Sequence, residues 1–265
     1  MILYKYQGAG NDFLIADNRD GSIKITTNDV SRLCHRRYGI GADGLMLLES
    51  EPGCDFRMVY YNSDGSGGMM CGNGGRCIVA FAWRCGIKSF EFIAADGRHS
   101  AEILKIDGNT LTVKLRMTDV SERVGYPDLG CTFLDTGTRH VVVPVTGIDD
   151  FPVVEYGRKM RYDPRFAPIG VNVNFIEPAG DKLKVRTYEK GVEDETFACG
   201  TGITASAIAY WHMSHPDYHG IGDCNVRQPI RALRDNLEVD FVPTRNGAKD
   251  VYLIGPATYV AKIEV

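Results

Sequence analysis

The 265-residue sequence contains an internal repeat. The motif Cys71-Gly72-Asn73-Gly74 returns as Cys199-Gly200-Thr201-Gly202. In both copies small and apolar residues follow, and one of the two tryptophans stands twelve positions after the cysteine. Three further blocks recur in the same order at nearly the same spacing: 10–13 with 137–140, 40–43 with 169–172, and 61–62 with 188–189. Because self-similarity at a fixed period indicates a repeated structural unit, the chain is predicted to be two copies of one unit fused head to tail.

Each half has the pattern of strands packed around one main helix. Residues 56–61 and 182–188 alternate between apolar and polar side chains, which predicts strands. After each cysteine motif the pattern is helical, with Ile78, Ala82 and Ile208 suited to facing the core. Further expected elements are strands at 45–48, 101–104, 110–115, 141–145 and 237–242, and a helix at 29–38. The predicted class is α+β, with two pseudo-symmetric lobes from an internal duplication, each a β-sheet or barrel wrapped around a central helix.

The boundary between the two lobes is expected within the polar stretch that begins at residue 118. This places an N-terminal lobe at residues 1–118 and a C-terminal lobe at residues 119–255. No low-complexity linker separates the lobes, so we expect them to pack closely, with the active site in the cleft between them.

Composition excludes several classes of protein. Apolar residues make up 44% of the chain and charged residues 24%, which is typical of globular proteins rather than disordered ones. The net charge of −4 and a pI near 5.9 argue against nucleic acid or an anionic membrane as a partner. Apolar runs such as 141–143 are much shorter than the ~20 residues that span a bilayer, and the N-terminus lacks the pattern of a signal peptide. We therefore expect a cytoplasmic protein.

The eight cysteines include no Cys-x-x-Cys pair, so the common zinc and redox spacings are absent from the sequence. Most are expected to be buried thiols, Cys77 among them. Histidines 212, 215 and 219 are expected in a solvated turn rather than at a metal. The glycine pattern at 39–44 has a helical segment before it and a strand-like one after it, the reverse of a dinucleotide-binding site. The sequence thus predicts no metal and no cofactor.

Cys71 and Cys199 differ from the other cysteines because they start the two repeated helices. A helix N-terminus carries partial positive charge and unpaired N–H groups, which favour a thiolate and bind a carboxylate. If both helix starts face one cleft, one thiolate can remove the α-proton of an amino acid while the opposite thiol delivers a proton. This chemistry inverts the carbon and needs no cofactor.

Several long motifs resemble the diaminopimelate epimerase family, and the resemblance extends from residue 1 to residue 257. They are 7–13, 38–44, 62–66, 70–77, 189–192 and 198–202. The resemblance implies a pyridoxal-independent isomerase that interconverts LL- and meso-diaminopimelate for lysine and cell-wall synthesis. It also implies a homodimer and a last strand, 256–265, that returns to the first lobe.

The resemblance also assigns residues. It makes Cys71 and Cys199 the catalytic pair, and it assigns His140 and Glu189 to adjusting the two thiol pKa values and holding the substrate's ammonium group. The implied substrate contacts are Asn11, Asn62, Gly72, Asn73, Asn172, Gly200 and Thr201. From the residues alone, the alternatives are a core histidine for His140, a surface charge for Glu189, and turn residues for Asn11 and Asn172.

Two places depart from the family pattern. Thr138-Arg139 stands where the family has Asn-Pro, and Lys190 stands where it has the arginine that binds the distal carboxylate. Lysine keeps the positive charge but lacks the two parallel donors with which arginine binds a carboxylate. Arg139 is a candidate to supply these donors in place of Lys190. These departures leave open a racemase of another amino acid, such as histidine, on the same fold. A non-catalytic thiol redox sensor is a third alternative.

Overall fold

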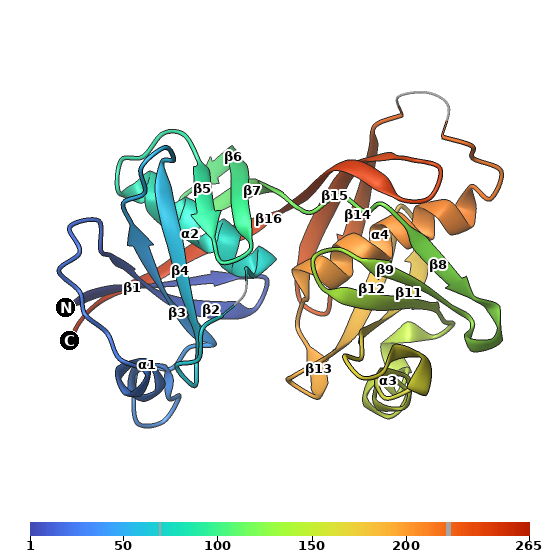
Figure 1. Ribbon diagram of the computed structural model, residues 1–265, viewed down its shortest axis with the longest axis horizontal. Coiled ribbons are helices and arrows are strands. Elements are labelled where there is room, and N and C mark those ends of the chain that lie inside the picture. The colour runs from blue at the N-terminus through green and yellow to red at the C-terminus, as the bar shows by residue number, and fades with distance from the viewer. Residues whose placement is uncertain (69, 221–223) are drawn as a thin grey trace. The chain divides into compact units, whose positions relative to one another are not determined.

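The computed structural model describes residues 1–68, 70–220 and 224–265. The chain forms two compact units: unit 1 consists of Met1–Leu115 with Gly255–Val265, and unit 2 of Arg116–Ile254. Both contain strands and helices, so the predicted α+β class is confirmed (Figure 1). The final strand β16 (Ala248–Glu264) contributes to both, because it pairs with β15 in unit 2 and with β7 and β1 in unit 1.

Eight strands of unit 1 form a closed ring. Besides β16 they are β1 (Ile2–Gly8), β2 (Asn11–Asp17), β3 (Gly44–Glu49), β4 (Phe56–Asn62), β5 (Glu91–Ala94), β6 (Gly97–Asp107) and β7 (Thr110–Arg116). Neighbours pair in chain order up to β7, β7 pairs with β16, and β16 pairs with β1. The helix α2 (Gly72–Arg84) is buried at every position from Gly72 to Ala82, as expected of a helix surrounded by strands.

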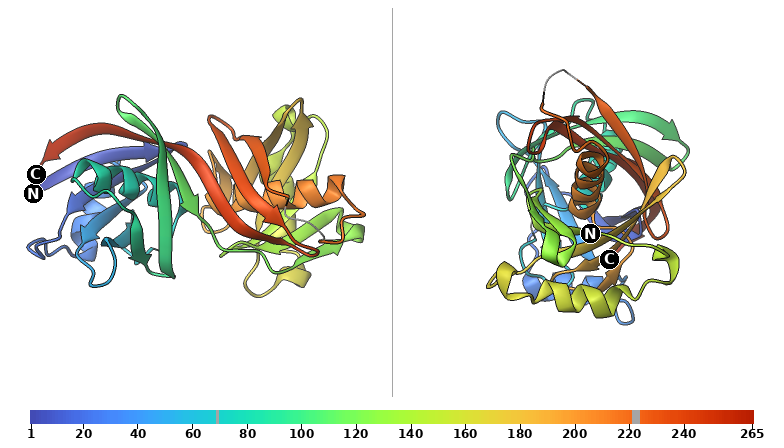
Figure 2. Two further views of the ribbon diagram at one scale, coloured as in Figure 1. Left: turned by 90° about the horizontal axis from the view of Figure 1, so that it is seen from above. Right: turned by 90° about the vertical axis from the view of Figure 1, so that its right-hand side faces the viewer.

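Unit 2 repeats this plan. Its strands are β8 (Arg123–Tyr126), β9 (Cys131–Asp135), β10 (Arg139–Pro144), β11 (Asn172–Ala179), β12 (Lys182–Glu189), β13 (Asp194–Thr196), β14 (Val226–Arg231) and β15 (Asn236–Pro243). They pair in the order β16-β15-β14-β12-β11-β10-β9-β8, and β13 adds to β12. A bridge between Val120 and Ala248 joins the chain just before β8 to β16. The helix α4 (Gly200–Ser214) lies inside these strands (Figure 2).

The remaining helices lie outside the two rings of strands. In unit 1, α1 (Thr27–Cys34) packs against β3, and in unit 2, α3 (Val153–Arg161) packs against β11 and β12. Three single-turn helices complete unit 2: η1 (Pro127–Leu129), η2 (Ile148–Asp150) and η3 (Pro164–Phe166). Both central helices are rich in glycine and alanine, and such small residues let the surrounding strands approach closely.

The strands expected from alternation are confirmed as β3, β4, β6, β7, β10, β12 and β15, with somewhat different bounds. Ile78, Ala82 and Ile208 are fully buried, as predicted. The helix expected at 29–38 is wrong at both ends. It begins earlier because Thr26 and Asp29 form a reciprocal capping pair, and it ends at Cys34 because His35 is extended.

One histidine prediction is also wrong. His212 lies within α4 rather than in a solvated turn, and it is buried with Nε2 2.9 Å from the carbonyl oxygen of Gly247. The contact partner is 35 positions away in the sequence, so the local pattern did not indicate it. Among the described residues, no cluster of His, Cys, Asp or Glu side chains is suited to hold a metal ion. No helix in the described ranges has the length and hydropathy needed to cross a membrane.

Candidate active site

The two repeated cysteines occupy the same structural position in their units. Each is the residue that precedes the central helix, with an extended backbone: φ −115° and ψ 126° at Cys71, and φ −101° and ψ 112° at Cys199. Each carbonyl oxygen accepts the first helical hydrogen bond, from Gly75 and Ile203 respectively. Both cysteines are partly exposed. Each sulfur-bearing residue therefore stands at the positive end of a buried helix.

In unit 1 the first turn of α2 is fixed by side chains. Asn73 is buried and donates from Nδ2 to Oδ1 of Asn11. Arg76 is completely buried and donates to Oδ1 of Asn73 over 2.9 Å, to the Gly72 carbonyl over 3.1 Å and to the Pro256 carbonyl over 3.3 Å. The arginine thus ties the start of α2 to β16.

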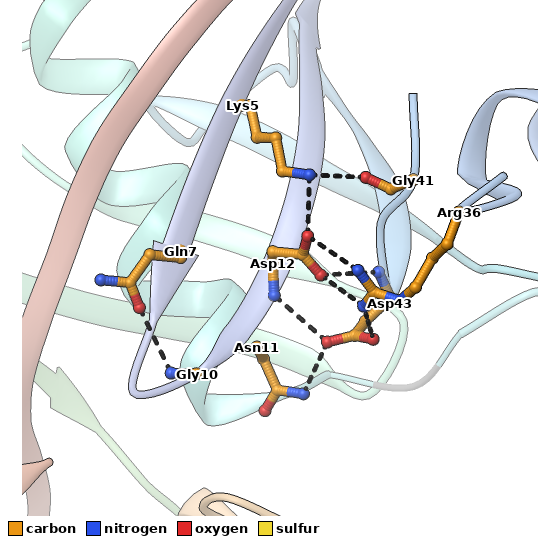
Figure 3. A network of polar contacts seen from close by, with 8 residues as sticks. All are labelled: Lys5, Gln7, Gly10, Asn11, Asp12, Arg36, Gly41 and Asp43. Atoms are coloured by element: carbon orange, nitrogen blue, oxygen red, sulfur yellow. Dashed lines mark hydrogen bonds and ion pairs between the residues drawn. The ribbon is translucent and has the colours of Figure 1, made fainter. Parts of the chain in front are cut away.

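A second set of contacts holds the other end of the Asn11 side chain (Figure 3). Its Nδ2 donates to Oδ2 of Asp43 over 3.1 Å, and the same oxygen accepts the Asp12 N–H. Arg36 donates to both carboxylates, and Lys5 lies 2.9 Å from Asp12 Oδ2. Burial of Asp12 opposes its ionisation, but the hydrogen bonds and charges of Arg36 and Lys5 outweigh it and lower the pKa of Asp12. Asn11 is therefore anchored at both ends within unit 1.

Asn62 is placed differently from the other predicted contacts of unit 1. It is exposed at the end of β4, and its Nδ2 donates to Ser66 Oγ over 3.0 Å. Its backbone N–H also donates to the Ser66 carbonyl. The side chain therefore shapes the turn after β4.

In unit 2 the structure brings His140 to the start of α4. His140 is fully buried, and burial lowers its pKa to about 3, so the ring is neutral. Its Nε2 lies 2.8 Å from Thr138 Oγ1 and 2.9 Å from Thr201 Oγ1, and Thr201 Oγ1 lies 3.4 Å from Cys199 Sγ. His140 thus reaches the cysteine through a threonine hydroxyl, and Asn174 contacts the other ring nitrogen.

Asn172 joins three strand ends beside this group. It pairs with His140 across β10 and β11, donates from Nδ2 to the Arg139 carbonyl, and accepts the Lys190 N–H at Oδ1 over 2.8 Å. Glu189, the last residue of β12, accepts from Thr196 Oγ1 over 2.8 Å. The predicted residues of unit 2 therefore gather around the ends of β10, β11 and β12 and the start of α4.

The two cationic side chains that depart from the family pattern have different surroundings. Lys190 is exposed, with Nζ 3.4 Å from the Ile169 carbonyl. Arg139 donates to the Phe166 carbonyl over 3.1 Å, and its guanidinium lies 5.3 Å from the centre of the Phe133 ring. Arg139 is thus bound within unit 2, which makes Lys190 the stronger candidate for a substrate contact.

Sequence reasoning missed several residues that position the site. They are Asp43 and Arg36 beside Asn11, Arg76 beside Asn73, and Asn174 beside His140. A signal existed for Asn174, because Asn172 and Asn174 share one face of a strand in which Val173, Phe175 and Ile176 are apolar.

Comparison with known proteins identifies the family. A family model described as diaminopimelate epimerase matches residues 3–122 and 132–221. The diaminopimelate epimerase of Flavobacterium psychrophilum is 43% identical over 264 residues, which cover 98% of this chain and 98% of the relative. That of Chlorobaculum tepidum is 40% identical over 96% of each chain. This chain belongs to the diaminopimelate epimerase family. The resemblance found in the sequence is confirmed, and the protein is an isomerase.

Two solved structures that share this fold have names other than diaminopimelate epimerase. A PhzF-family phenazine biosynthesis protein of Bacillus anthracis aligns with a TM-score of 0.75 at 17% identity, covering 100% of this chain and 98% of that one. A probable proline racemase of Agrobacterium radiobacter aligns with a TM-score of 0.69 at 16% identity, covering 100% and 92%. At such identities the likeness shows the fold alone.

Proposed function

We propose that this protein is a diaminopimelate epimerase, which interconverts LL- and meso-diaminopimelate by proton transfer between two cysteines and the α-carbon. The observation that carries the proposal is the repeated placement of a partly exposed cysteine at the N-terminus of a buried helix, once in each unit. A two-base inversion of a carbon centre requires two acid–base groups on opposite faces, one protonated and one ionised.

The reaction proceeds in two proton transfers. A thiolate removes the α-proton: the Cα–H bond breaks, an S–H bond forms, and the electron pair remains on Cα, delocalised toward the carboxylate. The other thiol then protonates the opposite face, so that its S–H bond breaks and it becomes the thiolate. The mechanism requires both sulfurs to reach the same carbon in the substrate complex, at roughly 3–3.5 Å. We assign Cys199 as the acceptor and Cys71 as the donor in one direction, and the reverse in the other.

The helix starts supply the electrostatic part of this mechanism. The N–H groups of Gly72 and Asn73, and of Gly200 and Thr201, are proposed to bind the substrate carboxylate, because a helix N-terminus favours an anion. That interaction becomes stronger as charge develops during removal of the α-proton. Further proposed contacts are Glu189 for the ammonium group, Lys190 for the distal carboxylate, and Asn11, Asn62 and Asn172 for the remaining polar groups.

Exchange of the α-proton with deuterated water tests the mechanism. The wild-type enzyme is incubated with LL-diaminopimelate in D₂O, and the product isomer is expected to carry deuterium at the inverted carbon by NMR. Cys71→Ala and Cys199→Ala should each slow epimerisation by at least about 10²-fold, the contribution of a positioned acid or base. Cys224→Ala replaces an exposed cysteine outside the two motifs and is the control, expected to retain full activity. Rapid epimerisation by either single variant of the pair would contradict the mechanism.

A second candidate is a racemase of another amino acid, histidine being one example. It is favoured by Thr138 and Lys190, which change the part of the site proposed to bind the distal end of the substrate. The same exchange experiment with histidine and other monocarboxylate amino acids separates the two. Exchange confined to diaminopimelate supports the first assignment, and faster exchange with a monocarboxylate supports the second.

We further propose that the enzyme acts in the cytoplasm, in lysine and cell-wall synthesis, and forms a homodimer. The second subunit is proposed to cover exposed apolar side chains on the strands of unit 1, such as Ile2, Ile106 and Val260. Light scattering is expected to give twice the chain mass, and a monomeric mass at micromolar concentration would contradict the dimer.

A further inference from the structure

A chain of hydrogen bonds in unit 2 ends at the sulfur of Cys199. It begins at Asn174, whose Nδ2 lies 3.1 Å from the Val141 carbonyl oxygen and 3.1 Å from His140 Nδ1. A backbone carbonyl only accepts, so the amide nitrogen must be the atom at this position, and Thr187 Oγ1 donates to the amide oxygen. The Asn174 N–H group therefore donates to Nδ1, and the ring proton of the neutral imidazole is on Nε2.

The direction of the remaining bonds follows from this tautomer. The Nε2–H of His140 points at the Thr138 and Thr201 hydroxyl oxygens, 2.8 and 2.9 Å away. Thr138 Oγ1 in turn donates to Thr201 Oγ1 over 3.0 Å. The Thr201 oxygen thus accepts from both neighbours, and its own single proton is left for the remaining contact, Cys199 Sγ at 3.4 Å.

We propose that the Thr201 hydroxyl, oriented by His140 and Thr138, donates a hydrogen bond to Cys199 Sγ and holds this sulfur as the proton acceptor of the resting enzyme. Thr138 and Thr201 are then positioning residues for the acid–base chemistry. The inference rests on the proposed function for its role in catalysis. It also gives Thr138, a departure from the family pattern, a part in the site.

The repeat shows that the corresponding position in unit 1 is built from different groups. A Cβ placed at Gly74 would lie 3.5 Å from Met46 Sδ and 3.6 Å from the Phe13 ring, both apolar. At the equivalent Gly202 it would lie 3.2 Å from the His140 ring. The ring that begins the hydrogen-bond chain to Cys199 is therefore specific to unit 2, because the apolar ring of Phe13 stands in its place in unit 1.

Alkylation of the ligand-free enzyme tests the relay. Iodoacetamide at pH 7 reacts with thiolates, and mass spectrometry of the peptide that holds Cys199 gives the rate for that residue. Thr201→Val, which keeps the shape and removes the hydroxyl, is expected to slow this reaction about tenfold, since a hydrogen bond to an ionised group is lost. Thr138→Val should slow it by a smaller factor, and Thr201→Ser should restore the wild-type rate.

Two controls separate the relay from general damage to unit 2. The rate at Cys71 in the same samples should not change, and Thr132→Val on β9, a threonine outside the relay, should leave the Cys199 rate unchanged. An unchanged Cys199 rate in Thr201→Val, or an equal loss in Thr201→Ser, would overturn the inference. If Thr201→Val does not fold, Thr138→Val provides the test, because Thr138 is exposed. An unchanged alkylation rate at Cys199 in Thr138→Val would exclude the relay.

The test is independent of the substrate. The alkylation rate is measured without an amino-acid substrate. The result therefore stands even if the exchange experiment shows that diaminopimelate is not the substrate. In the steady state, Thr201→Val and Thr138→Val are expected to lower kcat more than they raise KM, because the affected group acts in proton transfer.

Discussion

His140 occupies in unit 2 the position that Phe13 occupies in unit 1. Each residue lies on a strand that pairs in parallel with the following strand of its unit. Phe13 on β2 pairs with Gly44 on β3, and His140 on β10 pairs with Asn172 on β11. Each ring also lies against the third residue of its central helix. The two units therefore share the packing of a planar ring on the helix start, while the ring is apolar in unit 1 and polar in unit 2.

The neutral state of buried His140 makes stability depend on pH. Its pKa is about 3 in the folded protein, whereas an unfolded histidine has a pKa near 6.5. The unfolded chain therefore binds more protons between these values, and the stability contributed by the neutral ring is present above about pH 6.5 and is lost as pH falls toward 3. Between pH 7 and pH 5 this group should lower the free energy of unfolding by about 2 kcal/mol.

The phenylalanine of unit 1 suggests the reference variant. His140→Phe places in unit 2 the ring that unit 1 already packs, and it removes the titrating group. Urea unfolding at pH 7 and pH 5 is expected to show a loss of stability in the wild type that exceeds the loss in His140→Phe by about 2 kcal/mol. Equal losses in the two proteins would show that His140 does not stay neutral in the folded state.

The third helix residue is expected to tolerate alanine in one unit but not in the other. A Cβ on Gly202 would overlap Asn174 Oδ1, so Gly202→Ala should cost roughly 1–3 kcal/mol of unfolding free energy. The matched Gly74→Ala meets its nearest atoms at 3.5 Å, an ordinary contact distance, and alanine is the better helix former by up to ~1 kcal/mol. Urea denaturation measures both changes. A Gly74→Ala variant as unstable as Gly202→Ala would contradict the difference between the two helix starts.

The sequence was sufficient to predict those parts of the molecule that depend on local pattern and on the repeat. Periodicity and the duplicated motif predict the two central helices, the placement of a cysteine at the start of each helix, and most strands. The parts it did not predict depend on partners distant in sequence. Arg76 contacts a carbonyl 180 positions away, and Asn11 meets Asp43 across 32 positions. Such contacts exist only once the strands have paired.

Asp43 is expected to support activity without lying at a cysteine. It accepts hydrogen bonds from Asn11 and from the Asp12 N–H, and Arg36 donates to it. Asp43→Asn keeps the size but replaces one acceptor oxygen with an amide, so Asn11 should lose its fixed orientation. The loss of one hydrogen bond, about 1 kcal/mol, predicts a roughly fivefold decrease in kcat/KM for diaminopimelate.

Asp17→Asn is the matched control for this prediction. Asp17 is also a carboxylate of unit 1 paired with an arginine, but its partner Arg19 is two positions away and both side chains are about one-third exposed. Such exposed pairs contribute little, so activity should not change. If the two variants have the same kcat/KM, Asp43 has no specific role in positioning Asn11.

Lys190 provides the test of substrate specificity. Its backbone N–H is held by Asn172, while its side chain is exposed, so the charged end can be changed without disturbing the strands. Lys190→Arg supplies two parallel donors for a carboxylate and is expected to lower KM for diaminopimelate several-fold. Lys190→Met removes the charge and should raise KM about tenfold, since a charge-assisted hydrogen bond is lost. Arg139→Lys is the comparison, and it should change KM little because the arginine is bound to Phe166 within unit 2. If Lys190→Arg and Lys190→Met both leave KM unchanged, the distal carboxylate is bound elsewhere, and the monocarboxylate alternative becomes the better assignment.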